Sequence, residues 1–168
     1  MSRRLTFLRA ACAFVTVVGC GGGNDGGGGS AGPNTIAGAV DGPPWSRITS
    51  AHWIGMPSPG SPATIVFLLE QRVDCAGVSF VNWDDLVGES RILEIGLEAE
   101  AVRTFSVPAQ AYVAYSKGAY NPDADGGNVT VTGIVPSTKI TGTFDAKYRT
   151  DGLRGAFEAT YCPTGVEP

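Results

Sequence analysis

The chain has 168 residues, with 12 Lys or Arg against 16 Asp or Glu, and its formal net charge is −4 at pH 7. This length suits one domain with additional terminal segments. The chain carries no stripe of basic residues that would neutralise phosphates, so its composition argues against a nucleic-acid-binding protein.

A basic start followed by a short apolar segment opens the chain, which is the layout of a secretory signal. Three arginines accompany the apolar run Ala10–Val18, and Gly19 and Cys20 follow it. The run is shorter than the roughly 20 residues that a membrane-spanning helix needs. The ending Val17-Val18-Gly19-Cys20 resembles the lipobox of bacterial lipoproteins, a family in which the cysteine thiol receives a diacylglyceryl group and the chain is cut just before it. An ordinary signal peptide with an incidental cysteine is the alternative.

The lipobox resemblance implies where the protein resides. It predicts a signal peptide over residues 1–19 and a mature chain held in the bacterial cell envelope by lipid on Cys20. Gly21, directly after the cysteine, resembles outer-membrane rather than inner-membrane lipoproteins. Loss of the three signal arginines leaves nine basic and 16 acidic residues, a net charge of 9 − 16 = −7. A body this acidic has no electrostatic attraction to anionic lipid, so membrane attachment would rest on the acyl chains.

A glycine-rich segment separates the signal from the folded body. Residues 21–33 consist mostly of glycine and cannot contribute side chains to a core. They predict a flexible tether with a span of about 20 Å. We therefore expect a signal peptide over 1–19, a lipidated cysteine and tether over 20–34, and a single domain over 35–168.

Two of the four cysteines remain for a disulfide. Cys12 leaves with the signal and Cys20 is used for lipid, which leaves Cys75 and Cys162 in an oxidising compartment. Only one intramolecular pairing is then possible, and closing its loop of about 88 residues would stabilise the fold by about 4 kcal/mol. Two buried free thiols are the alternative. Because these cysteines are distant in sequence and the chain has a single histidine, we expect no zinc site, and no other metal or cofactor.

Strand patterns begin at Thr35. Residues 63–70 are apolar on both faces, which is typical of a central strand. Residues 91–100 alternate between aliphatic and mostly acidic positions. Their Leu, Glu and Ala content also suits a helix, but the period of two and the internal Gly96 favour a strand. Further strands are predicted at 35–40, 48–54, 104–107, 111–116 and 127–134, and the segment 75–88 is less regular, with room for one or two helical turns.

A hairpin is predicted at the C-terminal end of the domain. Asp151-Gly152 suits a two-residue type I′ turn, which would place Thr150 opposite Leu153. The same register sets Asp145 against Glu158. A like-charge pair costs about 0.2–1 kcal/mol, whereas burying each large apolar side chain contributes about 1.5–3 kcal/mol, so burial favours this register. The predicted buried face consists of Ile140, Phe144, Ala146, Tyr148, Leu153, Phe157 and Tyr161.

Together these patterns predict an all-β fold, an antiparallel β-sandwich or small barrel of about eight strands. The span 35–162 also resembles a group of small β-rich bacterial lipoproteins of unknown function. The resemblance lies in the lipobox, the glycine-rich tether, a cysteine after the central strand, and the ending Ile140-Thr-Gly-Thr-Phe-Asp … Gly155-Ala-Phe-Glu-Ala-Thr-Tyr-Cys162. It implies a β domain and supports the pairing of Cys75 with Cys162, and it carries no activity or site.

The segment Asn121-Pro-Asp-Ala-Asp-Gly126 is a candidate for metal binding. Its oxygen-bearing side chains at alternate positions and its sixth-position glycine resemble the opening of a calcium-binding loop. Such a loop needs a bidentate Glu at its twelfth position, where this chain has Thr132, and Pro122 stiffens the chain between the first two ligands. A polar turn between strands explains the same composition through backbone preferences, and we favour that interpretation.

We find no sequence motif of an enzyme in the chain. His52 is the single histidine, and without an identified partner we interpret it as a strand-end or surface residue. The adjacent pair Asp84-Asp85 would point to opposite faces of a strand, which does not suit an acid–base couple. The chain has three tryptophans, Trp45, Trp53 and Trp83. They could form an aromatic platform that binds a sugar, but we favour packing in the core.

Two classes of function remain for this chain. The first is a membrane-anchored bacterial lipoprotein that presents a compact, non-enzymatic β domain for structural or partner-binding work. The alternative is a ligand-binding module for a glycan or calcium. The sequence identifies no particular protein or glycan partner.

Overall fold

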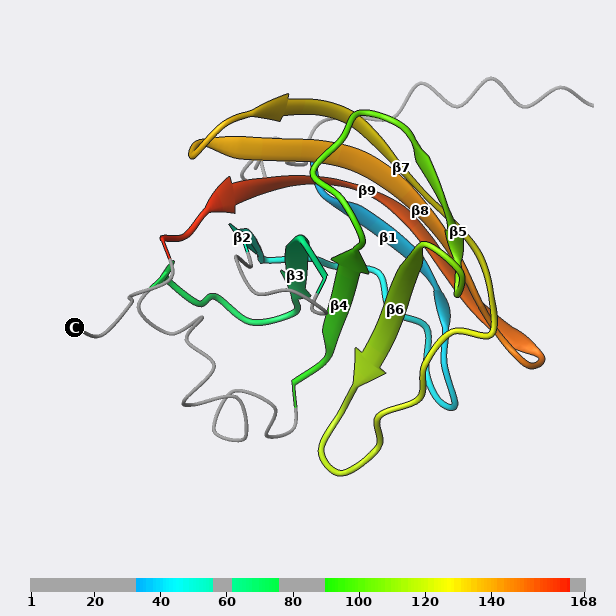
Figure 1. Cartoon of the computed structure of the whole chain (residues 1–168). Helices are drawn as coiled ribbons and strands as arrows, with labels where there is room; N and C mark the ends of the chain where they lie inside the picture. The colour runs from blue at the N-terminus through cyan, green and yellow to red at the C-terminus, as the bar shows by residue number, and fades with distance from the viewer. Residues whose placement is uncertain (1–32, 56–61, 76–89, 164–168) are drawn as a thin grey trace, which may run out of the picture. The chain divides into compact units, whose positions relative to one another are not determined.

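The computed structural model of the chain describes residues 33–55, 62–75 and 90–163, which lie in one compact unit (Figure 1). The predicted signal segment and lipobox lie outside these residues, as do nearly all of the tether and of the irregular segment 75–88. The described residues form nine strands and no α-helix. The strands are β1 (Thr35–Ala39), β2 (Ser50–Gly55), β3 (Thr64–Leu69), β4 (Ile92–Leu97), β5 (Thr104–Val107), β6 (Ala111–Ser116), β7 (Gly126–Val135), β8 (Lys139–Tyr148) and β9 (Asp151–Tyr161).

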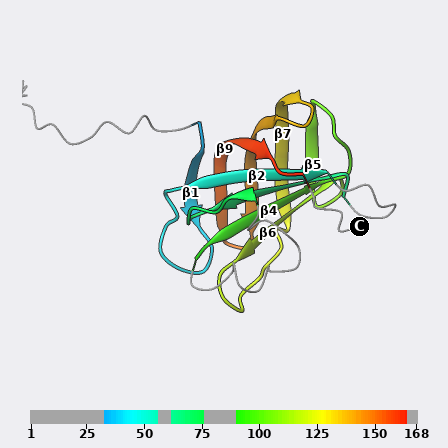
Figure 2. The same cartoon turned by 90° about the vertical axis from the view of Figure 1, so that its left-hand side faces the viewer.

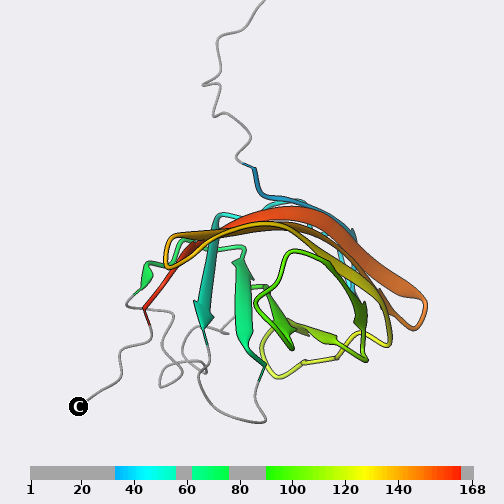
Figure 3. The same cartoon turned by 45° about the horizontal axis from the view of Figure 1, so that its top comes forward.

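The strands form one sheet that curls into a nearly closed barrel. Their order is β5-β7-β8-β9-β2-β3-β4-β6, with β1 also paired to β9. Figure 2 shows β2, β4 and β6 running across the direction of β7 and β9, and Figure 3 shows β7, β8 and β9 arching over the other layer. The edge strands β5 and β6 are joined by a tight turn, in which the Gln110 N–H donates to the Ser106 carbonyl at 2.8 Å. This architecture confirms the predicted all-β class.

β9 is long enough to pair with two strands along one edge. Its first half pairs antiparallel with β1, where Gly155 lies opposite Ile36. A Cβ at Gly155 would lie 2.0 Å from the Thr35 carbonyl oxygen, so only glycine lets β1 approach this closely. The end of β9 pairs in parallel with β2, where Tyr161 lies opposite Trp53. The chain turns back between β1 and β2, so β2 runs along β9, which departs from the purely antiparallel sheet that the sequence predicts.

The inward-facing side chains of the strands fill the barrel with one apolar core. As predicted, β3 is buried on both faces. Val66 and Leu68 belong to the interior core, whereas Phe67 and Leu69 belong to a second apolar cluster. The segment around Gly96 forms the strand β4, as predicted, although the strand ends at Leu97.

The C-terminal hairpin has the predicted buried face but a different register. The residues predicted for that face are buried, apart from Tyr161, which is partly buried and packs against the core. However, Tyr148 pairs with Asp151 and not with Gly155, so each partner on β9 lies 155 − 151 = 4 positions earlier than predicted. An even displacement leaves the buried face unchanged. It also sets Asp145 opposite Arg154, so that opposite charges replace the predicted like-charge pair.

Candidate functional site

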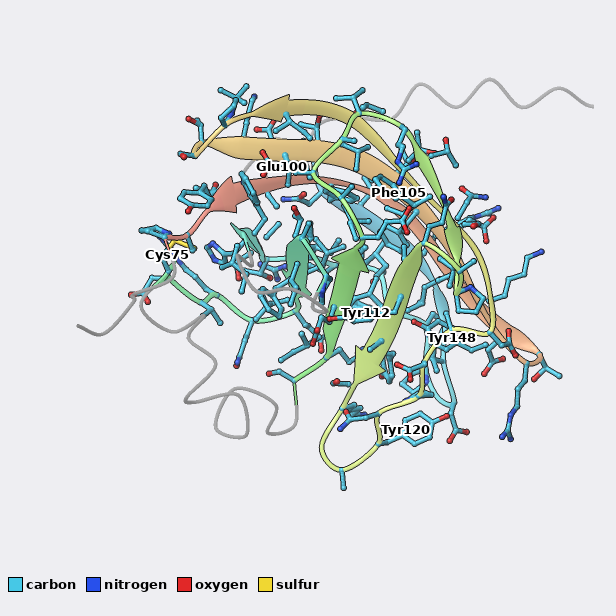
Figure 4. All side chains as sticks on the ribbon, in the orientation of Figure 1. Cys75, Glu100, Phe105, Tyr112, Tyr120 and Tyr148 are labelled. Atoms are coloured by element: carbon cyan, nitrogen blue, oxygen red, sulfur yellow. A yellow bond between two sulfur atoms is a disulfide. The ribbon has the colours of Figure 1, made fainter. Side chains whose placement is uncertain are left out.

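A pocket of about 620 Å³ lies beside the end of the barrel that carries Tyr120 and Tyr148, well away from Cys75 (Figure 4). Its volume lies within the range of about 300–1,000 Å³ that is typical of ligand sites. Three segments that are distant in the sequence form it: the residues after β1, the segment between β6 and β7, and the tip of the β8–β9 hairpin. We call it the aspartate–tyrosine pocket, and its lining residues are Val40, Asp41, Tyr120, Pro122, Asp123, Asp125, Tyr148, Arg149, Thr150 and Asp151.

Backbone hydrogen bonds hold the β6–β7 segment against β6. The Tyr115 N–H donates to the Pro122 carbonyl at 3.0 Å, and the Ala124 N–H donates to the Val113 carbonyl at 2.8 Å. Ala124 is buried in the core, whereas its neighbours on either side, Asp123 and Asp125, line the pocket. The candidate calcium segment therefore forms one wall of the pocket and is held in place by backbone hydrogen bonds to β6.

Two of the four pocket aspartates hold the walls together. The Asp125 carboxylate accepts a hydrogen bond from the Arg149 N–H at 2.9 Å, and this links the β6–β7 segment to the hairpin tip. The Asp151 carboxylate accepts one from the Asp41 N–H at 2.9 Å, and this links the hairpin tip to the residues after β1. The side chains of Asp41 and Asp123, which also line the pocket, make no hydrogen bond or ion pair with other described residues.

The two pocket tyrosines have different roles. Tyr148 is buried, and its hydroxyl donates to the Val113 carbonyl at 3.3 Å. Burial raises the pKa of Tyr148 above its usual range, and the negative charge of Asp123 raises it further. Tyr120 is 44% exposed, and its ring meets the Tyr115 ring edge-on at 6.3 Å between centroids. Tyr148 thus supports the pocket, while Tyr120 offers an aromatic surface to a ligand.

The pocket carries an excess of negative charge. Four aspartates and one arginine line it, which gives a formal charge of −4 + 1 = −3. The salt bridges among the described residues join Glu70–Arg91, Glu98–Arg103 and Lys139–Glu158, and none of them involves a pocket residue. The lining residues therefore carry a formal excess of negative charge that no salt bridge among the described residues neutralises.

The candidate calcium segment does not gather metal ligands by itself. Asp123 and Asp125 both line the pocket, as a ligand-binding segment would require. Yet in the part of the chain that the structure describes, one set of three His, Cys, Asp or Glu side chains has its ligand atoms within 4.8 Å of one another, and these aspartates do not belong to it. That set is His52, Cys75 and Cys162.

The disulfide between Cys75 and Cys162 is present, as predicted, with an S–S distance of 1.97 Å. His52 lies in the middle of β2 and not at a strand end, and it is half-buried beside the disulfide. Its Nδ1 lies 3.3 Å from the sulfur of Cys162 and 3.9 Å from that of Cys75. The sequence did not indicate this cluster, because His52 and Cys162 are 110 residues apart in the chain. The parallel pairing of β9 with β2 brings them together.

A half-buried carboxyl that the sequence did not single out, Glu94, lies on the barrel wall. The Tyr112 hydroxyl donates to the Glu94 carboxylate, and the Tyr112 ring occupies the space that a Cβ at Gly96 would need. Burial raises the pKa of Glu94, the hydrogen bond from Tyr112 offsets part of this effect, and the charge of Asp123 adds to it. A shallow hollow of about 340 Å³ lies beside Tyr112. Alternation alone marks Glu94 as solvent-facing, so its partial burial was not predictable.

The remaining sequence candidates fall in the core or outside the described residues. Trp45 and Trp53 are 1% and 2% exposed, so these two tryptophans pack in the core and offer no sugar-binding platform. Trp83, the Asp84-Asp85 pair and Cys20 lie outside the described residues. Nothing in the sequence marked Asp41 or Asp151 as partners of the candidate calcium segment, because they meet it only in the folded barrel.

Comparisons with known proteins identify no relative of this chain. No family model, no curated protein and no solved structure matches this chain. No helix among the described residues is long and apolar enough to cross a membrane.

Proposed function

We propose that this chain is a lipid-anchored protein of the bacterial cell envelope, whose β barrel is a non-enzymatic module that binds a positively charged segment of a partner. The proposed anchor rests on the lipobox that ends at Cys20. The proposed binding role rests on one observation, the uncompensated negative charge of the aspartate–tyrosine pocket.

The pocket chemistry suits a Lys or Arg side chain. Asp41 and Asp123 offer carboxylate oxygens that no described residue uses, and a bound cation would satisfy them through charge-assisted hydrogen bonds. The exposed ring of Tyr120 adds a surface over which a cation is attracted by the aromatic quadrupole. The walls are already tied by the carboxylates of Asp125 and Asp151, so little conformational freedom would be lost on binding.

The lining residues support binding more than catalysis. They include no histidine, cysteine or lysine, so the pocket lacks the most frequent general base and the most readily activated nucleophiles and offers only carboxylates and hydroxyls. Two of its carboxylates are committed to backbone N–H groups. What remains is a charged and aromatic surface of the kind that recognises a side chain.

Peptide binding to the purified Cys20→Ser chain tests this proposal. We expect fluorescently labelled oligo-lysine and oligo-arginine to bind, oligo-glutamate not to bind, and affinity to fall as salt is raised, because exposed charges are screened. Asp41→Asn with Asp123→Asn should weaken binding about tenfold or more, since a charge-assisted hydrogen bond contributes about 1.5–3 kcal/mol.

The matched control for that test is Asp145→Asn, on the exposed face of β8. It makes outside the pocket the change that Asp41→Asn or Asp123→Asn makes singly inside it, so it should leave the affinity nearly unchanged while each single pocket variant weakens binding. Equal losses in the control and in the pocket variant would mean that net charge, and not the pocket, attracts the peptide. No binding of either cationic peptide would refute the proposed ligand class.

A glycan is the second candidate ligand, and the exposed ring of Tyr120 favours it. Aromatic rings beside carboxylates also suit sugars, which stack on the ring and donate hydroxyl hydrogen bonds. A glycan array distinguishes the two ligands, because sugar binding should survive high salt and be lost in Tyr120→Ala.

The proposed anchor has its own test. Cys20→Ser should move the protein to the soluble fraction and abolish the incorporation of labelled fatty acid. Unchanged membrane partition together with unchanged labelling would refute lipidation at Cys20 without bearing on the pocket.

A further inference from the structure

The cluster of His52, Cys75 and Cys162 has a chemistry that the proposed function does not use. His52 lies in the middle of β2, Cys75 follows β3, and Cys162 follows β9. The Cys162 N–H donates to the Trp53 carbonyl at 2.8 Å, which extends the parallel pairing of β9 with β2 by one residue. One strand and the segments that follow two others therefore bring one imidazole and two sulfurs together.

The imidazole of His52 presents a lone pair to the sulfurs. Its Nε2 lies 2.7 Å from the Val73 carbonyl, and a carbonyl can only accept, so Nε2 carries the proton. Nδ1 is then the unprotonated nitrogen, and it faces Cys162 at 3.3 Å and Cys75 at 3.9 Å. A ring N–H that donates to a backbone carbonyl is the arrangement that orients metal-binding histidines.

The spacing of these atoms suits a tetrahedral metal ion. Zinc bonds of about 2.3 Å to sulfur and about 2.0–2.1 Å to nitrogen imply nitrogen–sulfur separations of about 3.5 Å in a tetrahedron. The two observed separations, 3.3 and 3.9 Å, lie on either side of this value. The two sulfurs would have to move apart to about 3.8 Å, which requires the disulfide to be broken.

The geometry points to a redox-dependent site: reduction of the Cys75–Cys162 disulfide creates, together with His52, a binding site for a thiophilic divalent metal such as Zn²⁺. The intact disulfide offers no thiolate. A thiol or phosphine reductant supplies two electrons, the S–S bond breaks, and each sulfur takes up a proton. The metal then binds both sulfurs as thiolates and releases these two protons to solvent, while Nδ1 of His52 contributes its lone pair.

The exposure of the two cysteines indicates which sulfur a reductant attacks. Cys162 is 1% exposed, whereas Cys75 is only partly buried, so we expect a reductant to attack the sulfur of Cys75, the more accessible residue. The electron pair of the broken bond passes to Cys162, whose sulfur is the nearer one to His52. The His and two Cys ligands leave a fourth tetrahedral position for water. This site lies far from the aspartate–tyrosine pocket and does not depend on the proposed function (Figure 4).

Cobalt spectroscopy of the purified full chain tests the inference, with Cys12→Ser and Cys20→Ser so that Cys75 and Cys162 supply its only thiols. The protein is reduced with a phosphine under anaerobic conditions, freed of reductant and titrated with Co²⁺. We expect one equivalent to bind with thiolate-to-cobalt charge-transfer bands and strong tetrahedral d–d bands, and we expect Zn²⁺ to displace it. The unreduced protein should show none of these bands.

The control variant is His52→Gln, whose amide can still donate to the Val73 carbonyl. Loss of a residue that only orients a metal ligand weakens metal binding by roughly 10–100-fold. Because His52 is proposed as a direct ligand, His52→Gln should weaken Co²⁺ binding by more than this. Equal binding by the variant, or one ion shared between two chains, would overturn the inference. If reduction unfolds the barrel, as judged by circular dichroism, Zn²⁺ should restore the strand signal in the parent but not in His52→Gln. Failure to restore it in the parent would also overturn the inference.

Discussion

The wall of the barrel formed by β8 and β9, which we call the alternating wall, distributes its apolar residues differently from β3. In β8 and β9 buried and exposed residues largely alternate, so one face packs into the core and the other is mostly polar. In β3 every residue is buried, and Phe67 and Leu69 join Ile54 and Ile92 in the second apolar cluster. The alternating wall has one face that tolerates substitution, whereas β3 has none. Neighbouring substitutions on each wall should therefore behave differently.

The largest expected effect is the loss of stability on both faces of β3. Phe67→Ala should lower the free energy of unfolding by about 3–5 kcal/mol and Leu68→Ala by about 2–5 kcal/mol, because both delete buried side chains. Denaturant melts of the two variants measure this. A near-neutral result for Phe67→Ala would show that the second cluster does not contribute to stability.

The alternating wall should respond to only one of two neighbouring substitutions. Phe157→Ala should cost about 3–5 kcal/mol, because Phe157 is buried in the core. Glu158→Ala should cost no more than about 1 kcal/mol, since it removes only a surface salt bridge to Lys139 at 3.0 Å. The same denaturant melts provide the comparison, and a larger loss for Glu158→Ala than for Phe157→Ala would contradict the assigned faces.

The register of the alternating wall can be tested by charge reversal. Asp145 lies opposite Arg154, so Asp145→Arg should destabilise the protein by about 0.2–1 kcal/mol. Adding Arg154→Asp should restore the loss, and a double-mutant cycle of melts at low salt measures the coupling. If Asp145 faced Glu158 instead, Asp145→Arg would raise stability, so the sign of the change distinguishes the two registers.

The smallest expected effect concerns Glu94 on the β4–β6 wall. Burial raises its folded-state pKa above the ordinary value of 4.5, so the folded protein holds this proton more tightly than the unfolded chain. The resulting stabilisation is fully present below pH 4.5 and is lost as the pH rises through the raised pKa. Glu94→Gln should flatten this part of the pH–stability curve. An unchanged slope between pH 4.5 and neutrality would show that Glu94 titrates normally.

Hydrophobic alternation predicted which residues are buried but not which residues are neighbours. The period-two pattern of β8 and β9 identified the core face correctly, because a buried face excludes polar side chains whatever the partner strand. The turn was misplaced because Asp151-Gly152 is a strong turn signal, yet both residues belong to β9. Instead, Arg149 adopts the positive φ of 51° at the hairpin tip. A displacement by an even number of residues keeps the same face buried, so burial alone could not decide between the registers.

The sequence by itself determined the all-β class, the positions of most strands and the pairing of Cys75 with Cys162, because these follow from local periodicity and from the number of cysteines. Only the tertiary structure decided the two sites. Asp41, which follows β1, and Asp151, which begins β9, meet the β6–β7 segment at one end of the barrel. His52 meets the disulfide because β9 runs parallel to β2. Both sites depend on which strands become neighbours, and local sequence patterns do not specify strand pairing.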